Sequence, residues 1–307
     1  MIKKVLVTGG AGFVGCHLVD RLLSEGQDVT VLDNLSRGNL QNLPNVHDDL
    51  KFVRGDINDV DLISGLIEDS DVVFHLAALS RVMTSIKNPD KCFDDNVHGV
   101  EVIARLCSKY HKKLVFSSSR EVYGNALYTP VDEDHPLTPE NPYGVSKLCG
   151  EKIIVTYSKC YSLKYSILRL ANVYGYKDFQ RVIPTFVEKT IKDQALVVFG
   201  GQQIIDFVHV NDVVDVLLKA SNNNENITLN IGSGKGTTVL EIARLIQEIG
   251  HCRGRIIHKK KRQGEVECFI AKIDTAKKLL NWAPKTELKA ELTRLLYSDR
   301  TQLCQIS

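Results

Sequence analysis

Residues 5–15, V-L-V-T-G-G-A-G-F-V-G, decide the fold of this chain. The apolar run at 5–7 predicts a strand that is buried on both faces. Gly9, Gly12 and Gly15 follow at three-residue spacing, and apolar residues then recur at helical spacing. A strand, a glycine turn and a helix in this order bring a phosphate close to the backbone and to the helix N-terminus. The stretch therefore predicts dinucleotide binding.

A second apolar run, residues 28–33, ends in Asp33, about 20 residues after the glycine turn. A carboxylate at this place binds the adenosine ribose hydroxyls of NAD and repels the additional phosphate of NADP. The alternative is an acid that caps the following turn, and Arg37 lies near enough in sequence to keep NADP open. We expect NAD as the cofactor.

Strands and helices alternate along the first half of the chain, which predicts a parallel, doubly wound sheet. Further strands are expected at 50–53, 72–76, 114–118 and 164–170, and long helices at 90–110 and 143–160. The rhythm is less regular afterwards, with short strands at 195–199, 204–208 and 228–231. The expected fold is an α/β doubly wound parallel (Rossmann) sheet with a smaller carboxyl-terminal α/β substrate lobe.

The expected domains are a cofactor-binding domain of residues 1–171, with an interleaved later segment of about 204–232, and a substrate lobe formed mainly by 172–307. The fraction of hydrophobic residues, 43%, is sufficient for a sizeable core. A formal net charge of +2 indicates no nucleic-acid or membrane partner. The eight cysteines are scattered without metal-ligand spacing, and no signal or membrane-length apolar run is found. We expect a cytoplasmic protein with reduced thiols and without a metal.

Tyr143 and Lys147 stand at i and i+4 in Y-G-V-S-K and share one helix face. A tyrosine normally loses its proton near pH 10, but a neighbouring lysine cation and a positive nicotinamide ring are expected to lower its pKa. Ser119, at the end of the fifth strand, can donate a hydrogen bond to the same substrate oxygen. The alternative for the pair is a solvated helix face. After a glycine turn and a serine-ended strand, the pair predicts a general base.

With these motifs the sequence resembles the extended short-chain dehydrogenase/reductase superfamily, in particular its NAD-dependent nucleotide-sugar epimerases and dehydratases, a group that includes the UDP-glucose 4-epimerases. The matching motifs are T-G-G-A-G-F-V-G (8–15), L-D-N (32–34), G-D-I (55–57), H-L-A-A (75–78), S-S-S-R-E-V-Y-G (117–124), N-P-Y-G-V-S-K (141–147), L-R-L-A-N-V-Y-G (168–175), V-I-P (182–184), D-F-V-H-V-N-D (206–212), N-I-G-S-G (230–234), R-Q-G-E (262–265) and L-L-N-W-A-P (279–284).

The resemblance implies that Tyr143 removes the proton of a sugar hydroxyl while a ring hydrogen passes to NAD, with assistance from Ser119. It also implies that Lys147 holds the nicotinamide ribose. The residues expected to contact NAD, from the patterns and the resemblance together, are Gly9, Gly12, Phe13, Val14, Gly15, Asp33, Asn34, Asp56, Ile57, Leu76, Ala77, Ala78, Asn96, Ser117, Tyr143 and Lys147. Those expected to contact the substrate are Arg81, Ser119, Arg120, Asn172, Arg181, Val182 and Arg262.

Two departures from the family pattern matter: Ile205, and a short segment between Gly175 and Val182 that borders the nucleotide pocket. Ile205 stands where the family often has a phosphate-binding arginine, so the diphosphate is expected to rely on Arg262 and Arg181. At 120–121, similar 4,6-dehydratases carry Asp-Glu, but Arg120 cannot donate a proton near neutral pH. Glu121 is a candidate catalytic residue that also matches the nucleotide-glucuronate decarboxylases. Its alternative role is a salt bridge with Arg120 or with the lysine of the Tyr-Lys pair.

The expected function is NAD-dependent 4-epimerisation of a UDP-hexose, UDP-N-acetylhexosamine or UDP-uronate through a transient keto-sugar. The alternatives are a decarboxylase or 4,6-dehydratase on the same scaffold, and a non-catalytic NAD-binding protein. The resemblance further implies a homodimer in which the helices at 90–110 and 143–160 pair with their copies. The apolar positions expected at that interface are Val97, Val100, Ile103, Ala104, Ile153 and Ile154.

Overall fold

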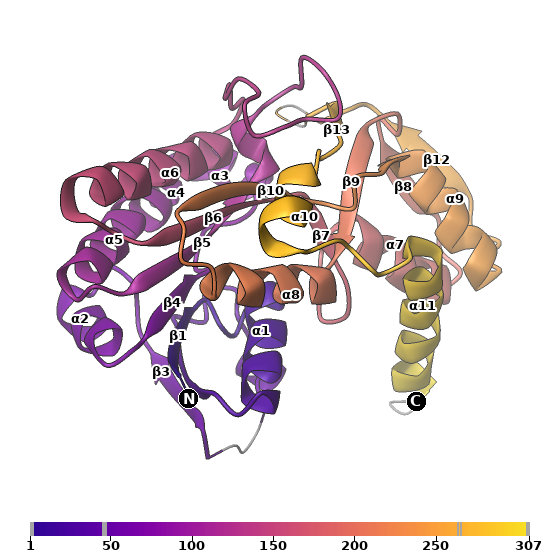
Figure 1. Cartoon of the computed structure of the whole chain (residues 1–307). Helices are drawn as coiled ribbons and strands as arrows, with labels where there is room; N and C mark the ends of the chain where they lie inside the picture. The colour runs from indigo at the N-terminus through magenta and orange to yellow at the C-terminus, as the bar shows by residue number, and fades with distance from the viewer. Residues whose placement is uncertain (1–2, 45–47, 263, 265, 305–307) are drawn as a thin grey trace.

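A seven-stranded parallel sheet forms the centre of the protein (Figure 1), seen in a computed structural model that describes residues 3–44, 48–262, 264 and 266–304. The strand order is β10-β6-β5-β4-β1-β2-β3. The order reverses beside β1, because β2 and β3 lie on one side of it and β4 on the other. In parallel α/β sheets such a reversal opens a crevice at the carboxyl ends of the strands. The strand bounds are β1 (Lys4–Thr8), β2 (Asp28–Asp33), β3 (Leu50–Arg54), β4 (Val72–His75), β5 (Lys113–Ser119), β6 (Tyr165–Leu170) and β10 (Ile227–Ile231).

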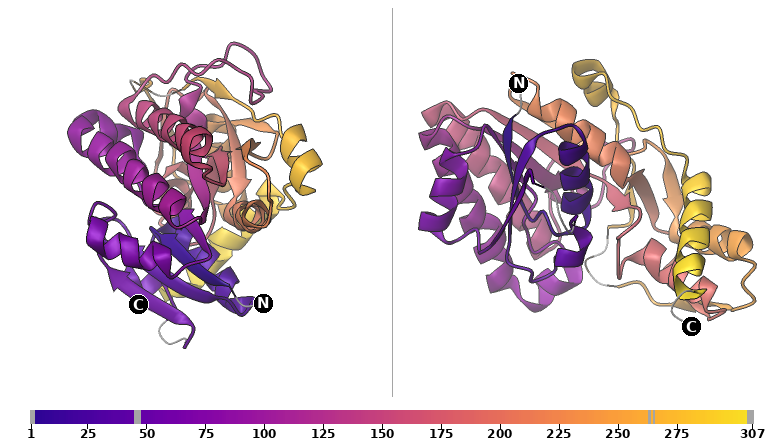
Figure 2. Two further views of the ribbon diagram at one scale, coloured as in Figure 1. Left: turned by 60° about the vertical axis from the view of Figure 1, so that its left-hand side comes forward. Right: turned by 90° about the horizontal axis from the view of Figure 1, so that it is seen from below.

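Helices cover both faces of this sheet, as the view from below shows (Figure 2). On one face, α1 (Phe13–Ser24) and α8 (Val210–Ser221) pack against alternate strand residues such as Val5 and Val7. On the other, α2 (Val60–Glu68), α5 (Gly99–Lys109) and α6 (Pro142–Tyr161) pack against the residues between them, such as Leu6. Burial of both faces explains the unbroken apolar runs in the strands.

The carboxyl-terminal elements build a smaller lobe beside the sheet. It contains a four-stranded sheet, in which β9 pairs with β7, β11 and β13, and a two-stranded sheet of β8 and β12. A separate core joins these strands to α7, α9 and α11. The bounds are β7 (Asn172–Tyr174), α7 (Val182–Ile191), β8 (Leu196–Phe199), β9 (Ile204–His209), β11 (Gly236–Thr238), α9 (Val239–Gly250), β12 (Ile256–Lys259), β13 (Cys268–Phe269), α10 (Asp274–Leu280) and α11 (Leu288–Cys304). The expected fold class is confirmed.

The expected interleaved segment 204–232 divides between the two units. Its α8 and β10 lie on the large sheet, whereas β9 lies in the small one. The domain boundaries themselves stay a prediction. Within the described part of the chain, no helix is both long and apolar enough to cross a membrane.

The helix expected at 90–110 is interrupted. The chain forms α4 (Pro89–Phe93), a π-helical turn at Asp94–His98 and then α5, preceded by the short α3 (Val82–Lys87). Four of the apolar positions assigned to a dimer interface, Val100, Ile103, Ala104 and Ile154, are instead buried in the core of the same chain. That part of the interface prediction is wrong, because these side chains form the stripe that faces the sheet.

Candidate active site

A cavity of about 1060 Å³ lies at the carboxyl ends of β1, β2, β4 and β5 and extends to the smaller lobe. It joins the predicted cofactor and substrate residues in one continuous space. The predicted residues that line it are Gly9, Gly12, Phe13, Val14, Gly15, Asp33, Asn34, Asp56, Ile57, Leu76, Ala77, Ala78, Arg81, Ser117, Ser119, Arg120, Glu121, Tyr143, Asn172, Arg181, Val182 and Arg262. No three His, Cys, Asp or Glu side chains in the described ranges are arranged to hold a metal ion.

The glycine turn has the geometry that a diphosphate needs. Gly9 has a φ of +72°, and a Cβ there would lie 2.7 Å from the backbone nitrogen of Ala77. A Cβ on Gly15 would collide with the Gly9 carbonyl oxygen, so helix and turn could not pack as they do. Gly12 is the N-cap of α1 and offers no side-chain capping bond. The uncapped helix N-terminus therefore faces the cavity and fits the diphosphate of NAD.

Asp33 is 8% exposed, and its carboxylate is fixed by the backbone. Oδ2 accepts from the Ala11 N–H at 3.0 Å, and Oδ1 from the Leu35 N–H at 2.8 Å. Burial raises the pKa of this carboxyl above its ordinary value. Arg37, the cation that kept NADP open, donates to the Ser80 hydroxyl at 2.6 Å and points into the cavity. The Asp33 carboxylate thus fits the ribose of NAD.

Asn34 and Asp56 close the same end of the cavity. The Asn34 amide donates to Asp56 Oδ2 at 2.9 Å, and Oδ1 of the same carboxylate accepts from the Asn58 N–H. The following helix α2 is capped by Asp59, whose carboxylate accepts from the Leu62 N–H, so Asp56 is not a helix cap.

Tyr143 lies in the first turn of α6, beside Ser119 at the end of β5. The helix begins here because the Asn141 side chain accepts from the Gly144 N–H at 2.9 Å and Pro142 occupies the first helical position. Ser119 Oγ accepts from the Glu121 N–H at 3.2 Å, so its own proton can be donated to the tyrosine hydroxyl. The Ser-Tyr pair predicted from the sequence is therefore assembled in the structure.

Lys147 and Asn96 lie behind the cavity wall. Lys147 is 3% exposed and donates to the Ser117 carbonyl at 2.8 Å, while its Nζ is 6.0 Å from the Tyr143 ring centroid. Asn96 accepts from the Leu79 N–H at 2.8 Å and donates to Ser146 Oγ at 2.9 Å. Asn96 thus supports the backbone that follows β4 and does not line the cavity.

The protein chain by itself does not favour the phenolate of Tyr143. Burial raises the pKa of Tyr143 to about 12, opposed by the hydrogen bond from Ser119 and by the charge of Arg181. Burial also lowers the pKa of Lys147 to about 8. In the chain alone, desolvation of the phenolate outweighs the neighbouring charges, and the lowering of the tyrosine pKa by lysine and nicotinamide together stays a prediction.

The smaller lobe contributes the substrate side of the cavity. Arg181 precedes α7, is paired with Asp178 at 3.6 Å and lies 5.7 Å from the Phe13 ring centroid. Arg262 lies 3.9 Å from the Phe199 ring centroid, and Ile205 lines the wall between the two lobes. Gln263 and Glu265 of the R-Q-G-E motif lie outside the described residues. Arg181 and Arg262 thus line the cavity that also contains Ile205, the residue at the position where the family often has an arginine.

Comparison with known proteins decides the family. The model of the NAD-dependent epimerase/dehydratase family matches residues 5–232. The chain belongs to this family. The predicted resemblance is confirmed, and with it the dependence on NAD that defines the family.

Relatives within the family differ in reaction. A Methanocaldococcus jannaschii protein provisionally named UDP-glucose 4-epimerase is 42% identical, over 95% of this chain and 97% of its own. The Thermotoga maritima UDP-glucose 4-epimerase, solved with UDP-glucose, has a TM-score of 0.93 at 34% identity and covers 98% of this chain and 99% of that one. A Danio rerio protein named UDP-glucuronic acid decarboxylase 1 is 30% identical, over 96% of this chain and 72% of its own length.

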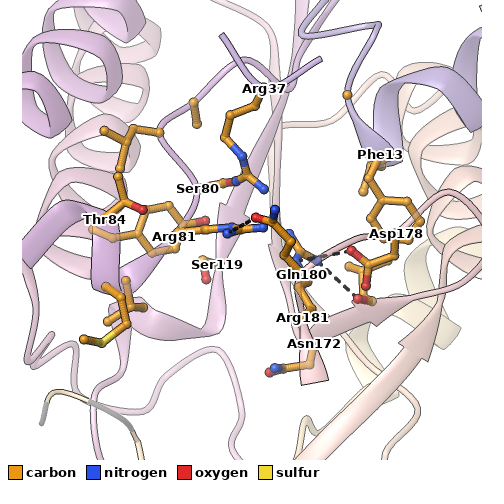
Figure 3. A pocket seen from close by; sticks show the side chains of 18 of the residues that line it. Phe13, Arg37, Ser80, Arg81, Thr84, Ser119, Asn172, Asp178, Gln180 and Arg181 are labelled. Atoms are coloured by element: carbon orange, nitrogen blue, oxygen red, sulfur yellow. Dashed lines mark hydrogen bonds and ion pairs between the residues drawn. The ribbon is translucent and has the colours of Figure 1, made fainter. Parts of the chain in front are cut away.

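Residues 176–181, which we call the strap, form the short segment that the sequence analysis placed at the border of the nucleotide pocket, but their contacts with Arg81 and Arg37 were not predicted. The Arg81 guanidinium donates to Gln180 Oε1 at 2.8 Å and to the Phe179 carbonyl at 3.2 Å (Figure 3). The Phe179 ring centroid lies 5.8 Å from the guanidinium carbon of Arg81 and 5.7 Å from that of Arg37. At its start, Lys177 donates to the Asn42 carbonyl at 2.7 Å. The strap thus ties the smaller lobe to the cofactor-binding half across the cavity, and no periodicity in the sequence signals it.

Proposed function

We propose that this protein is an NAD-dependent nucleotide-sugar epimerase that inverts carbon 4 of a UDP-linked sugar. The observation that carries the proposal is the placement of Ser119 and Tyr143 together in a cavity that also contains the glycine turn and Asp33. The relatives named for UDP-glucose 4-epimerisation support the reaction.

Tyr143 acts as the general base in this proposal. It accepts the proton of the sugar 4-hydroxyl and returns it after the keto-sugar has presented its other face. Ser119 donates a hydrogen bond to the same oxygen. The role that the resemblance gives Lys147, holding the nicotinamide ribose, stays a prediction, because its Nζ donates to the Ser117 carbonyl behind the cavity wall. Bound NAD supplies the acceptor and later the donor of the hydride.

The diphosphate of the substrate is proposed to lie at the start of α7. That helix begins at Val182 without a side-chain cap, so its N-terminus attracts an anion. Arg181, Arg262 and Asn172 line the same cavity as this helix N-terminus. We propose that they take over the role of the phosphate-binding arginine that the family often has at the position of Ile205. The sugar is proposed to be a hexose, an N-acetylhexosamine or a uronate.

The test is incubation of the purified protein with UDP-hexose, UDP-N-acetylhexosamine and UDP-uronate, followed by mass spectrometry and NMR. The proposal is supported by an equilibrium mixture of two sugars that have equal mass and differ at carbon 4, formed without net consumption of NAD. Loss of carbon dioxide from the uronate identifies a decarboxylase, and loss of water from the hexose identifies a dehydratase.

We also propose a cytoplasmic homodimer. The seven cysteines whose side chains the structure describes are free, as is typical of a reducing compartment. Phe93 and Tyr161 are 38% and 61% exposed on α4 and α6, the helices assigned to self-pairing. Burial of such apolar side chains against a second copy would favour association.

A further inference from the structure

Arg120 and Glu121 form a buried ion pair directly after Ser119. They begin the 3-10 turn Arg120–Val122 at the end of β5, and both line the cavity. Arg120 Nη2 lies 2.9 Å from Glu121 Oε1, and the two side chains are 11% and 8% exposed. Because both charges are removed from water, removing one partner would leave the other buried without compensation.

Each partner of this pair also holds a residue from another element. Arg120 Nε donates to Asn172 Oδ1 at 2.7 Å, on β7 of the smaller lobe. Glu121 Oε2 accepts from the Asn141 side-chain amide at 2.8 Å. The same asparagine is the N-cap of α6, and its side-chain oxygen accepts from the Gly144 N–H, next to Tyr143. A continuous network thus runs from the substrate lobe to the start of the helix that carries the base.

Both carboxylate oxygens of Glu121 therefore accept from nitrogen donors. Protonation of this carboxyl would remove the negative charge that strengthens both of these bonds and that compensates Arg120. The carboxylate is placed to hold the helix cap and is poorly placed to deliver a proton to a substrate hydroxyl.

We propose that Arg120 and Glu121 act together as a neutral positioning unit for Tyr143, and that Glu121 is not a proton-transfer group. This inference rests on the proposed function for the identity of the base. Glu121 was a candidate catalytic residue in the sequence analysis. The pair holds Asn141, and so the first turn of α6, while Arg120 cancels a negative charge that would oppose the phenolate.

The charged surroundings of Tyr143 come from several elements. Its pKa is raised by Glu121 from the turn after β5 and by Cys92 from α4, and lowered by Arg181 from the strap. Lys147 on α6 and Arg37 after β2 are further cations near Tyr143 among the described residues. The charge of Glu121 is paired with that of Arg120, so substitution of one or both members of this pair tests its effect on Tyr143 separately.

The experiment compares Arg120→Met, Glu121→Gln and the double variant in the full-length protein with bound NAD. The pH dependence of kcat/KM for epimerisation is measured with the UDP-sugar that the wild type accepts. Arg120→Met leaves the Glu121 charge uncompensated, so the acidic limb should move up by roughly one pH unit and kcat should fall about tenfold. Glu121→Gln should move the limb down. The double variant should restore it to within a few tenths of a pH unit of the wild type.

A direct titration separates this inference from the proposed reaction. The ultraviolet absorbance change of phenolate formation is recorded for each variant and corrected with the matching protein that also carries Tyr143→Phe. The upward shift in Arg120→Met, the downward shift in Glu121→Gln and their cancellation in the double variant should appear there even with no substrate. Failure to find an epimer would therefore overturn the proposed function alone. Loss of at least about a hundredfold in turnover in Glu121→Gln without rescue in the double variant would show that Glu121 transfers a proton. Equal tyrosine titrations in all variants would also overturn the positioning role.

Discussion

Tyr143 is the residue on which the proposed chemistry depends, and the fold places its hydroxyl where an anion is costly. Burial raises its pKa to about 12, while Ser119 and Arg181 oppose this effect. Phenolate formation in the chain alone is therefore favoured only at high pH. The positive charge of an oxidised nicotinamide beside the ring acts in the opposite direction, so cofactor and base are linked by charge.

We expect Tyr143→Phe to reduce turnover by roughly a hundredfold to ten-thousandfold, because it removes the hydroxyl that exchanges the proton. The fold and the retention of NAD should be unchanged, since the ring keeps its packing. Product formation is measured by NMR, with circular dichroism and the amount of NAD released on denaturation as controls. Activity near that of the wild type would show that another group is the base.

Asp178 makes a second prediction at the residue scale, this time for stability. Burial raises the pKa of its carboxyl to about 6 from an ordinary 3.8, although Arg181 lowers it. Because the folded protein binds this proton more tightly than the unfolded chain, the stabilisation is full below about pH 4 and is lost as the pH rises through 6.

The variant Asp178→Asn should remove this pH dependence. Relative to the wild type, its free energy of unfolding should rise between about pH 4 and about pH 8 by up to about 3 kcal/mol. Urea unfolding of both proteins across this range, at saturating NAD, measures the difference. A constant difference at all pH values would contradict the raised pKa.

At the scale of elements, the strap connects the smaller lobe with the cofactor-binding half across the cavity. Its backbone is held in an unusual form, with positive φ at Lys177 (63°) and Gln180 (56°). Such conformations are costly for residues other than glycine and persist where surrounding contacts hold them. The bonds from Arg81 to the strap are such contacts. We therefore expect the strap to restrain the release of NAD.

We expect Gln180→Ala to accelerate the release of NAD about tenfold, because it removes a hydrogen bond from a guanidinium. Gln180→Glu gives Arg81 a charged partner and should slow the release. Released cofactor is measured by absorbance after rapid gel filtration, so the result does not depend on activity. The matched control is Arg21→Ala, which removes an exposed ion pair with Glu25 on α1. If the wild type, Gln180→Ala, Gln180→Glu and Arg21→Ala all release NAD at the same rate, the expected role of the strap is contradicted.

At the scale of the whole molecule, the proposed dimer depends on the surface that α4, α5 and α6 present to a second copy. Most of the apolar stripe on α5 and α6 faces their own sheet. The exposed apolar side chains on the outer surface are fewer than the sequence indicates and include Phe93 and Tyr161.

We expect sedimentation at micromolar concentration to give the mass of a dimer. The double variant Phe93→Asp and Tyr161→Asp should shift the protein toward the monomer, because it places like charges at the interface of two copies. The control is the double variant Leu40→Asp and Leu127→Asp, because these leucines are also exposed but lie outside α4, α5 and α6. A monomeric mass for the wild type would refute the dimer.

The sequence alone determined the parts of the protein that are built from neighbouring residues. Strand and helix periods within about ten residues determine each of these features. They are the glycine turn, the acid at the end of β2, and the tyrosine that stands one helical turn before its lysine. The salt bridge weighed for Glu121 with Arg120 also joins neighbours in the chain, and it is present.

Only the tertiary structure decided the contacts between distant segments. Arg81 meets Gln180 across 99 residues, and Arg120 meets Asn172 across 52. The short strands β7, β11 and β13 form because they pair with β9, and β12 because it pairs with β8. Their own residues carry too little pattern to predict them. The pKa of Tyr143 depends on how completely the surrounding elements exclude water. Spacing along the chain places a residue on a helix or strand, whereas burial and distant partners arise only when whole layers pack together.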